Sequence, residues 1–340
     1  MDGERWDFAS DNTAGMADEA LAALAEANRG QVASYGDDPS TRAAAAAFRR
    51  WFAHDCDVYF VFNGTAANAL ALAALCQPHQ GVLVGERAHV ETDECGAPEF
   101  FSNGSKLVAI PDEHGKLGSE RIAAAATRRS DIHFPRLRAL SLSQTTEMGT
   151  VYTPAELTAV CATARAHGLR VHLDGARFAN ALVALGCSPA DLTWRAGVDV
   201  ACIGGTKLGV GIGEAVVFFD RALSHDFAAR CKQAGQLASK MRLLTAPWAN
   251  ALRQGWWERH ARHANAMAAR LAAGLRAAGI GLLHPVEANA VFCDLSEPRA
   301  VHLRARGWRF YRFIGGGARF MTSWATTPDA VEALLRDLRV

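Results

Sequence analysis

Two short stretches carry residues of the types that catalysis uses, and each comes at the end of an apolar run. The sequence HLDGAR, which contains Asp174, ends a run that begins at Leu169, and the sequence GGTK, which ends at Lys207, follows the run 198–203. Both runs are short and rich in Val, Leu or Ile, which predicts two buried strands. Ligands of open α/β sheets bind beyond the carboxyl ends of the strands, so Asp174 and Lys207 are expected to meet at one site.

An aspartate and a lysine at such an edge fit a pyridoxal phosphate site. Lys207 would hold the cofactor as a Schiff base, and Asp174 would pair with its pyridinium nitrogen. Each residue also has an ordinary interpretation, because Asp-Gly after a strand is usually a turn and a lysine among glycines is usually a solvated loop charge. The spacing of the pair after two strands favours the cofactor site.

A third strand, expected at residues 58–62, leads into a candidate phosphate site. Asn63, Gly64 and Thr65 follow it, and an apolar helix is expected at residues 66–76. The first backbone N–H groups of a helix are unpaired and its dipole favours an anion, so Gly64 and Thr65 are candidates to bind a phosphate monoester. The alternative is a plain turn in which Thr65 caps the helix, since the stretch matches neither a P-loop nor a dinucleotide fingerprint.

His89 opens a dense run of polar residues, 89–94, after the strand expected at 81–85. A histidine just beyond a strand end could face a flat cofactor ring. A solvated loop is the alternative interpretation.

Strands that alternate with helices between residues 58 and 219 predict a mainly parallel sheet of the α/β class. Four further strands are expected at 106–111, 138–143, 169–173 and 215–219, besides those at 58–62, 81–85 and 198–203. Helices are expected at 17–28, 42–53, 119–128, 156–167 and 178–185, with Ser40 or Thr41 capping the second.

The chain of 340 residues is too long for one core, and the pattern changes near residues 233–247. We expect a large cofactor-binding domain at 1–247 and a small α+β domain at 248–340. The small domain begins with a long helix, 248–278, and for its His260 and His263 we favour surface or packing roles over metal binding. Within it, the stretch 315–320 places Arg319 at the start of an apolar strand.

Composition excludes several classes of function. The 36 Lys and Arg residues nearly balance 35 Asp and Glu residues, which leaves no electrostatic footprint for nucleic acid or for an acidic membrane surface. The eight cysteines show no Cys-x-x-Cys pair and no zinc spacing, which indicates a reducing compartment and no metal. An apolar signal core and a membrane-length apolar run are also lacking, so we expect a cytoplasmic protein.

Seven short motifs stand in order along the chain: Ser10-Asp11, YGDDP at 35–39, NGTxxN at 63–68, Ala88-His89, DIH at 131–133, HLDGAR at 172–177 and Thr206-Lys207. With these motifs in order, the chain resembles the low-specificity L-threonine aldolases, pyridoxal phosphate enzymes of the aspartate-aminotransferase fold (fold type I). Residues 91–107 and 230–247 look most similar to the pseudomonad branch, which includes phenylserine aldolases. Many family members carry Ser-Leu-Glu-Asn-Thr at 141–145 and Ser-Lys at 206–207, where this chain has SLSQT and Thr-Lys.

The resemblance implies retro-aldol cleavage of L-threonine, L-allo-threonine and related L-β-hydroxy-α-amino acids, with phenylserine among them, to glycine and an aldehyde. Lys207 would be the Schiff-base lysine, and Asp174 would keep the pyridine nitrogen protonated. Arg177 and Arg319, with Ser10, would hold the substrate carboxylate, for which a planar guanidinium is suited.

The base that removes the β-hydroxyl proton stays open between His89, His133 and a water molecule, although stacking on the cofactor is the favoured role of His89. The resemblance also implies a homodimer or homotetramer with shared sites, in which Tyr35 and Lys232 reach the neighbouring subunit's site and Lys232 helps to bind the cofactor.

Three kinds of function compete with this one: another pyridoxal phosphate reaction, a non-catalytic role and an NAD-dependent reaction. A β-eliminating lyase or an aminotransferase would use the same Lys207 and Asp174. A non-catalytic protein that keeps the fold is disfavoured, because both residues are intact. An NAD-binding enzyme is disfavoured, because the first strand is not followed by Gly-x-Gly-x-x-Gly.

Overall fold

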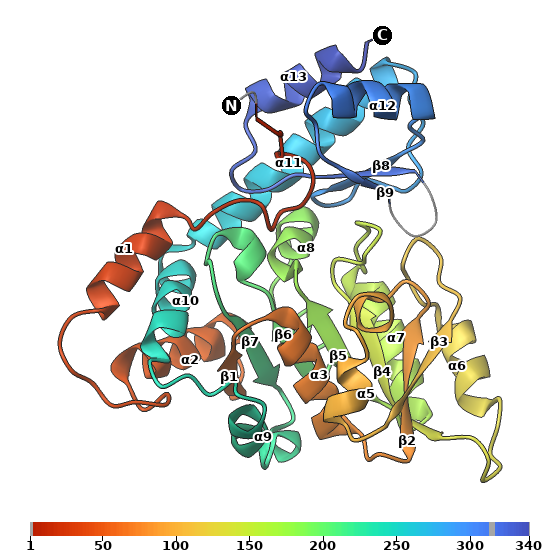
Figure 1. Ribbon diagram of the computed structural model, residues 1–340. Coiled ribbons are helices and arrows are strands. Elements are labelled where there is room, and N and C mark those ends of the chain that lie inside the picture. Colours follow the sequence, from red (N-terminus) through yellow and green to blue (C-terminus); the bar gives the residue numbers. More distant parts are fainter. Residues whose placement is uncertain (1–2, 313–316, 340) are drawn as a thin grey trace.

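A seven-stranded sheet forms the centre of the computed structural model, which describes residues 3–312 and 317–339 (Figure 1). The strand order is β1-β7-β6-β5-β4-β2-β3, and β7 alone in this sheet runs antiparallel to its neighbours. The prediction of a mainly parallel α/β sheet is confirmed, and the expected strands differ from the observed ones by at most two residues at either end. The strands are β1 (Asp57–Val61), β2 (Gln80–Gly85), β3 (Lys106–Ile110), β4 (Arg136–Ser143), β5 (Arg170–Gly175), β6 (Val200–Ile203) and β7 (Glu214–Phe218).

Helices cover both faces of the sheet, so its central strands are apolar on both sides. Successive side chains of a strand point to opposite faces. In β6, Val200 and Cys202 accordingly belong to a core under α3 (Gly64–Leu75), whereas Ala201 and Ile203 belong to the larger core on the other face. Because Asp174 pairs in register with Cys202, this alternation turns Asp174 toward α3.

The remaining helices around the seven-stranded sheet pack against these two cores. The core under α3 also includes residues of α4 (His89–Thr92) and α9 (Phe227–Gln233), and α5 (Ala97–Phe101) packs on α3. The larger core draws on α2 (Pro39–Phe52), α6 (Ser119–Thr127), α7 (Pro154–Ala166), α8 (Phe178–Leu185) and α10 (Arg242–Gln254), and α1 (Asp18–Ala27) packs on α10.

The predicted cap of the second helix is wrong by two or three residues. Asp38 caps α2, because its carboxylate accepts the backbone N–H of Thr41 at 2.9 Å and the Thr41 hydroxyl at 2.7 Å. Pro39 then occupies the first helical turn, where its missing N–H costs nothing.

The C-terminal unit packs a three-stranded antiparallel sheet against helices. The single helix expected at 248–278 is two helices, α10 and α11 (Trp256–Ala277), because Gly255 takes a left-handed conformation between them. Gly315 and Gly316 of the glycine run before Arg319 lie outside the described residues. The other elements are β8 (Ala290–Cys293), β9 (Tyr311–Arg312), β10 (Ala318–Met321), α12 (Glu297–Ala305) and α13 (Pro328–Asp337), with sheet order β8-β10-β9.

The N-terminal segment lies against this C-terminal unit and not against the large sheet. Phe8 is fully buried in the same core as Leu271 and Phe320, and its ring centroid is 5.6 Å from that of Trp308. The domain boundary expected at residue 247 stays a prediction. Phe8 connects the two predicted domains, because it belongs to the first by sequence and packs in the core of the second.

His260 and His263 have packing roles. His260 bonds to the carbonyl oxygen of Leu208 and stacks on Trp324, and His263 bonds to the carbonyl oxygen of Thr326. None of the described helices has the length and apolarity that a membrane crossing requires.

Candidate active site

Asp174 and Lys207 lie in one cavity at the carboxyl edge of the sheet. β5 and β6 are hydrogen-bonded neighbours, so the end of β5 with Asp174 lies beside the 3-10 turn Thr206–Leu208 that follows β6. The cavity has a volume of about 220 Å³, and Asn63, Gly64, Thr65 and His89 also line it. The structure therefore brings together the residues predicted to bind the cofactor ring, its phosphate and its aldehyde carbon.

Asp174 is buried and remains a carboxylate. Its Oδ2 accepts the side-chain N–H of Asn68 at 2.9 Å, and its Oδ1 accepts the backbone N–H of Ala176 at 2.9 Å. Burial alone would raise the pKa of Asp174, but the charge of His89, the Ala176 N–H and the charge of Lys207 together hold it below its usual value. An ionised carboxylate here suits a partner that carries a proton, such as a pyridinium nitrogen.

His172 lies two residues before Asp174 on the same face of β5, beneath the cavity. Its ring nitrogens are 2.9 Å from Ser141 Oγ and 3.3 Å from Cys202 Sγ, and the ring is fully buried. Burial lowers the pKa of His172 to about 4, so this imidazole is neutral at physiological pH. It supports the strand that carries Asp174.

The start of α3 has the geometry that the predicted anion site requires, and its cap is Asn63 and not Thr65. The Asn63 side chain accepts the backbone N–H of Ala66 at 2.9 Å. The N–H groups of Gly64 and Thr65 belong to the first helical turn, which has no intrahelical acceptors, and both residues face the cavity. The alternative in which Thr65 caps the helix is therefore wrong, and both residues are free to bind an anion.

A glutamate and an asparagine that the sequence analysis missed hold His89 and Asp174 together. Glu94 Oε1 lies 2.8 Å from His89 Nδ1 and accepts the side-chain N–H of Asn68, at 2.8 Å, so Asn68 joins Glu94 to Asp174. The hydrogen bond to Glu94 raises the pKa of His89. The ligand atoms of His89, Glu94 and Asp174 lie within 4.8 Å of one another, a spacing that could suit a metal, but these groups already bond to each other and to Asn68.

Glu214 fixes the turn that carries Lys207. Its Oε2 accepts the backbone N–H of Gly205 at 2.7 Å, and its buried side chain also lines the cavity. Gly205 packs against Trp248, whose ring carbon would be 2.5 Å from an added Cβ, so a larger residue there would displace the turn. These contacts aim the Lys207 amine into the cavity.

A second cavity of about 400 Å³ adjoins the first, since Asn12, His89 and Lys207 line both. Its walls contain the residues predicted to bind the substrate carboxylate, Ser10, Arg177 and Arg319, together with Asp93, Glu147, Tyr311 and Arg312. Arg319 comes from β10 and Ser10 from the N-terminal segment, so this cavity lies where the two units meet.

Arg177 is held by a buried aspartate. Its Nε and Nη2 donate to the two carboxylate oxygens of Asp11 at 2.7 and 2.9 Å, and the side chain of Asn289 donates to Asp11 at 2.9 Å. Burial would raise the pKa of Asp11, but the charge of Arg177 holds it below its usual value. Two of the five guanidinium N–H groups are thus engaged, and three remain for a ligand in the cavity.

Glu147 is a further residue that the sequence analysis missed. It lies in the loop after β4, and its side chain lines the second cavity beside His89. Its Oε1 accepts the hydroxyl of Ser143 at 2.6 Å and the backbone N–H of His89 at 2.9 Å. No single motif marks it, because the loop reaches the site only after β4 has paired with β2 and β5.

His133 does not reach this site. It is exposed in the loop before β4, where its backbone N–H donates to Asp131. The amino end of β4 is the sheet edge opposite to Asp174 and Lys207. Within one chain, His133 is therefore not brought to this cavity, and its role as the base stays a prediction.

Tyr35 and Lys232 lie outside both cavities but next to each other. The Lys232 ammonium is 4.6 Å from the centre of the Tyr35 ring, and half of Tyr35 is exposed. Their predicted contribution to a neighbouring subunit's site stays a prediction.

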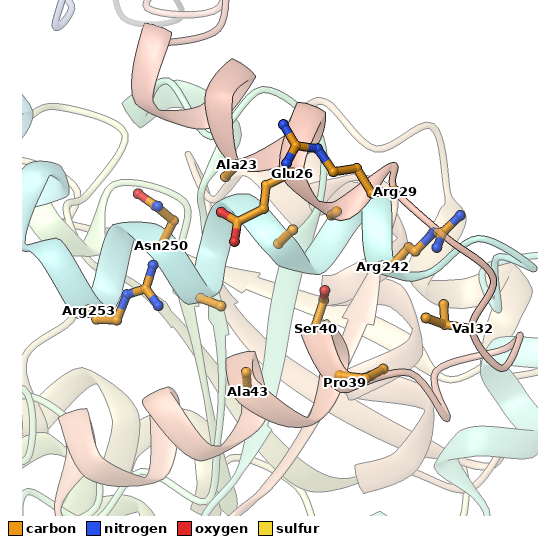
Figure 2. Close-up of a pocket in the computed structure, with 13 residues that line it drawn as sticks. Ala23, Glu26, Arg29, Val32, Pro39, Ser40, Ala43, Arg242, Asn250 and Arg253 are labelled. Atoms are coloured by element: carbon orange, nitrogen blue, oxygen red, sulfur yellow. The ribbon is translucent and has the colours of Figure 1, made fainter.

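A third cavity, of about 330 Å³, opens between α1, α2 and α10 (Figure 2). Figure 2 shows the side chains of Glu26, Arg29, Arg242 and Arg253 around it. None of the predicted site residues lines this cavity, so it is separate from the site that contains Asp174 and Lys207.

The donors of the first cavity fit pyridoxal phosphate. A primary amine, a buried carboxylate that stays ionised, and an unpaired helix N-terminus face the same space. These are the groups that a Schiff base, a pyridinium nitrogen and a phosphate need.

Similarity to known proteins decides between the enzyme classes that share such a site. The model of the beta-eliminating lyase family matches residues 7–298. A low specificity L-threonine aldolase from Pseudomonas aeruginosa is 59% identical over 336 residues, which cover 98% of this chain and 97% of that protein. The chain belongs to the low-specificity L-threonine aldolases, within the beta-eliminating lyase family. The predicted resemblance is confirmed.

Solved structures agree with this assignment. The threonine aldolase of Leishmania major superposes with a TM-score of 0.93 at 32% identity, over 98% of this chain and 99% of that one. Aspartate aminotransferase from Thermus thermophilus superposes with a TM-score of 0.70 at 18% identity, over 100% and 90%, which shows the fold alone. The predicted fold type, the enzyme class of aldehyde-lyase and the cofactor pyridoxal phosphate are confirmed.

Proposed function

We propose that this aldolase cleaves L-threonine, L-allo-threonine and related L-β-hydroxy-α-amino acids, phenylserine among them, to glycine and an aldehyde. One observation carries the proposal. The cofactor cavity with Lys207 and Asp174 opens into a second cavity in which Arg177 and Arg319 supply positive charge for an amino acid carboxylate. The membership of the threonine aldolases supports the choice of reaction.

The first cavity would hold the cofactor through four groups. Lys207 would bind its aldehyde carbon, Asp174 its ring nitrogen, and the N–H groups of Gly64 and Thr65 its phosphate, while the imidazole of His89 would lie against the ring. Bound there, pyridoxal phosphate supplies an electron sink for the bond that breaks at Cα. Glu94 and Asn68 keep His89 and Asp174 in place by the hydrogen bonds described above.

The second cavity would orient the amino acid. The free N–H groups of Arg177, the guanidinium of Arg319 and the hydroxyl of Ser10 would bind the carboxylate, because two planar forks can fix its plane. Fixing the carboxylate sets the rotation about Cα and thereby selects which bond stands perpendicular to the cofactor ring. Asp11 holds Arg177 rigid for this purpose.

Arg319→Lys tests the carboxylate clamp. We expect the KM for L-threonine to rise about tenfold or more with a smaller change in kcat, since a hydrogen bond to a charged group contributes roughly 1.5–3 kcal/mol. Steady-state kinetics check this result. Arg309→Lys is the matched control, because Arg309 pairs with Glu4 outside the cavity. An unchanged KM in Arg319→Lys would remove Arg319 from the clamp.

The reaction itself is tested with the cofactor-loaded protein and three substrates in parallel: L-threonine, L-allo-threonine and L-phenylserine. Glycine is measured together with acetaldehyde or benzaldehyde, and equal amounts of glycine and aldehyde are expected. Formation of a keto acid and ammonia without aldehyde would instead indicate β-elimination, and transfer of the amino group to an added keto acid would indicate an aminotransferase. Failure with phenylserine alone would narrow the substrate range without changing the reaction.

A second copy of the chain is proposed to complete the site. Tyr35, Phe62 and Ile212 are each about half exposed, and Phe62 directly precedes Asn63, which caps α3 beside the candidate phosphate site. Exposed apolar side chains beside a functional site favour a covering partner. Tyr35 and Lys232 would then reach the cofactor or substrate of the neighbouring subunit in a homodimer or homotetramer.

Mixing two inactive variants tests the shared site. If Lys207 of one chain and Tyr35 with Lys232 of the other form one site, a heterodimer of K207A and the double variant Y35A/K232A has one intact site. If the chains pair at random, half of the dimers are heterodimers, and each heterodimer has one of its two sites intact. About a quarter of the wild-type activity is therefore expected to return. Light scattering gives the number of subunits. No recovery after proven subunit exchange would contradict the shared site.

We also propose the cytoplasm as the location of the enzyme. All eight cysteines are free, and six of them are buried. Buried thiols in an enzyme with no disulfide are typical of a reducing compartment. Fractionation of cells that express the native gene tests this proposal.

A further inference from the structure

We propose that Glu147 takes the proton from the β-hydroxyl group of the substrate. This inference rests on the proposed aldolase function, because only a β-hydroxy amino acid has that proton. It assigns to a carboxylate the role for which the sequence suggested two histidines or a water molecule.

The position of Glu147 is the first argument. Its side chain lines the cavity that contains Arg177 and Arg319, the residues expected to hold the carboxylate, and Lys207, which marks the reacting carbon. A substrate held by its carboxylate at one end and by its nitrogen at the other presents its β-substituents to the remaining wall. Glu147 and His89 line this cavity without being among the groups expected to hold the carboxylate or the nitrogen.

The hydrogen bonds of Glu147 are the second argument. Both donors, the hydroxyl of Ser143 and the backbone N–H of His89, bind Oε1. No other described residue donates a hydrogen bond to Oε2, which is the oxygen left for a ligand in the cavity. The carboxyl group is thus anchored by one oxygen and presents the other, which is the arrangement that a general base needs.

The electrostatic setting is the third argument. Burial raises the pKa of Glu147 to about 7, although the hydrogen bonds from Ser143 and His89 act against it. A carboxyl group that titrates near neutrality accepts and returns a proton readily at physiological pH. The other charged groups that line the same cavity are His89, Asp93, Arg177, Lys207, Arg312 and Arg319.

His89 is less suited to the same step. Its Nδ1 is 2.8 Å from Glu94, and this hydrogen bond raises the pKa of His89, which favours the protonated ring. His89 also lines the cofactor cavity beside Asp174, where it can face the cofactor ring. Of the two cavities, Glu147 lines only the one expected to hold the substrate.

The step balances in atoms and electrons. Glu147 Oε2 forms a bond to the hydroxyl proton, and the former O–H electron pair becomes the second bond of the aldehyde carbonyl. The Cα–Cβ bond breaks, and its electron pair stays with Cα. Cα then takes one proton from solvent, and Glu147 releases the hydroxyl proton to solvent, so that glycine and a neutral aldehyde leave and the carboxylate is restored.

Glu147→Gln tests the inference because the amide oxygen can keep both hydrogen bonds at the Oε1 position while the proton acceptor is lost. We expect the kcat for threonine cleavage to fall by about 10²- to 10⁴-fold, the usual contribution of a general base. The exchange of the α-hydrogen of glycine in D₂O should stay near the wild-type rate, since that reaction uses Lys207 and the cofactor but no hydroxyl group. The absorbance of the bound cofactor should also be unchanged.

Two further measurements separate catalysis from structure. In the wild type, kcat/KM for threonine should rise with pH through about 7, as Glu147 loses its proton, and this limb should be absent in E147Q. Infrared difference spectra of the holoenzyme should show a protonated carboxyl band that titrates in the same range and is missing in E147Q. E147D, which keeps a carboxylate on a shorter side chain, should recover part of the lost activity.

Glu287→Gln is the matched control, since Glu287 also accepts a backbone N–H, from Val151 at 2.7 Å, but does not line the substrate cavity. It should leave both reactions unchanged. Near-wild-type cleavage by E147Q, or an equal loss of cleavage and glycine exchange, would overturn the role of Glu147. A wild-type enzyme that exchanges glycine but cleaves no β-hydroxy amino acid would instead refute the proposed function, and the inference with it.

Discussion

Lys207→Ala is expected to reduce threonine cleavage by about 10³-fold or more, because it removes the covalent attachment point on which the rest of the site depends. Among the described residues that line the two cavities, Lys207 is the only lysine. Neither Arg177 nor Arg319 can replace it, since a guanidinium stays protonated and does not add to an aldehyde. The variant should also lose the visible absorbance of the lysine-bound cofactor.

Borohydride reduction followed by peptide mass spectrometry gives a second reading of the same prediction. In the wild type, the reduced cofactor should be found on the peptide that contains Lys207, and in Lys207→Ala no lysine should carry it. Lys106→Ala is the control, because Lys106 is exposed on β3 at the edge of the sheet. A wild-type spectrum in Lys207→Ala would mean that another lysine binds the cofactor, and the assignment of this cavity would fail.

The features that sequence reasoning found are local ones. Asp174 and Lys207 each follow an apolar run, and the run predicts the strand while the strand end predicts the edge of the sheet. The helix start at Gly64 and Thr65 follows the same logic. A residue whose role depends on its own strand or turn can therefore be predicted from a few neighbours in the sequence.

The features that sequence reasoning missed depend on contacts between distant segments. Asn68 and Glu94 meet Asp174 only because the alternation of β5 turns Asp174 toward α3. Asp11 comes from the N-terminal segment and meets Arg177 across 166 residues of sequence. Asp11 and Asn68 stand in motifs of the resemblance and Glu94 in the polar run 89–94, but no periodicity or spacing assigns a partner to any of them.

The position of His133 away from the cavity has a related cause. Its motif stands in the same chain order as those of the site residues, but order along the chain does not say which edge of the sheet a loop occupies. In a parallel sheet, the loop before a strand and the loop after it lie at opposite edges. His133 precedes β4 and Glu147 follows it, so the strand separates the predicted base from the residue that lines the cavity.

The site concentrates buried acids, and each has a partner that keeps it in place. Asp11 bonds to Arg177, Glu94 to His89 and Asn68, and Glu214 to the backbone of Gly205. Leaving a buried neutral polar group without a hydrogen-bond partner costs about 1–3 kcal/mol of folding free energy. For a buried carboxylate without partners the cost is larger. These acids position Arg177, His89 and Lys207. The many charged groups around the small cavity are therefore explained by this positioning role.

Asp174→Asn should produce the second large effect, a fall in kcat of about 10³-fold with cofactor binding retained, because a neutral amide cannot hold a proton on the pyridine nitrogen. The substitution keeps the shape of the side chain, and the amide oxygen can still accept the N–H of Ala176. The new amide N–H₂ would face the N–H₂ of Asn68, which keeps its bond to Glu94, so the substitution removes one hydrogen bond of this network. A typical hydrogen bond contributes about 0.5–1.5 kcal/mol, which is small beside the free energy of unfolding of a folded protein. The fold should therefore survive, and the loss should lie in the chemistry.

Steady-state kinetics and cofactor absorbance measured together check this expectation, with Asp199→Asn as the control. Asp199 is also a buried aspartate beside β5, but it accepts the backbone N–H of Val171 and pairs with Arg170 at the opposite end of the strand. Removal of the Asp199 carboxylate should lower the melting temperature of the protein without a comparable loss of kcat in the folded enzyme. If Asp174→Asn keeps near-native turnover, another group protonates the ring. The ionised state of Asp174, which His89, Ala176 and Lys207 maintain against its burial, would then serve the stability of the site and not its reaction.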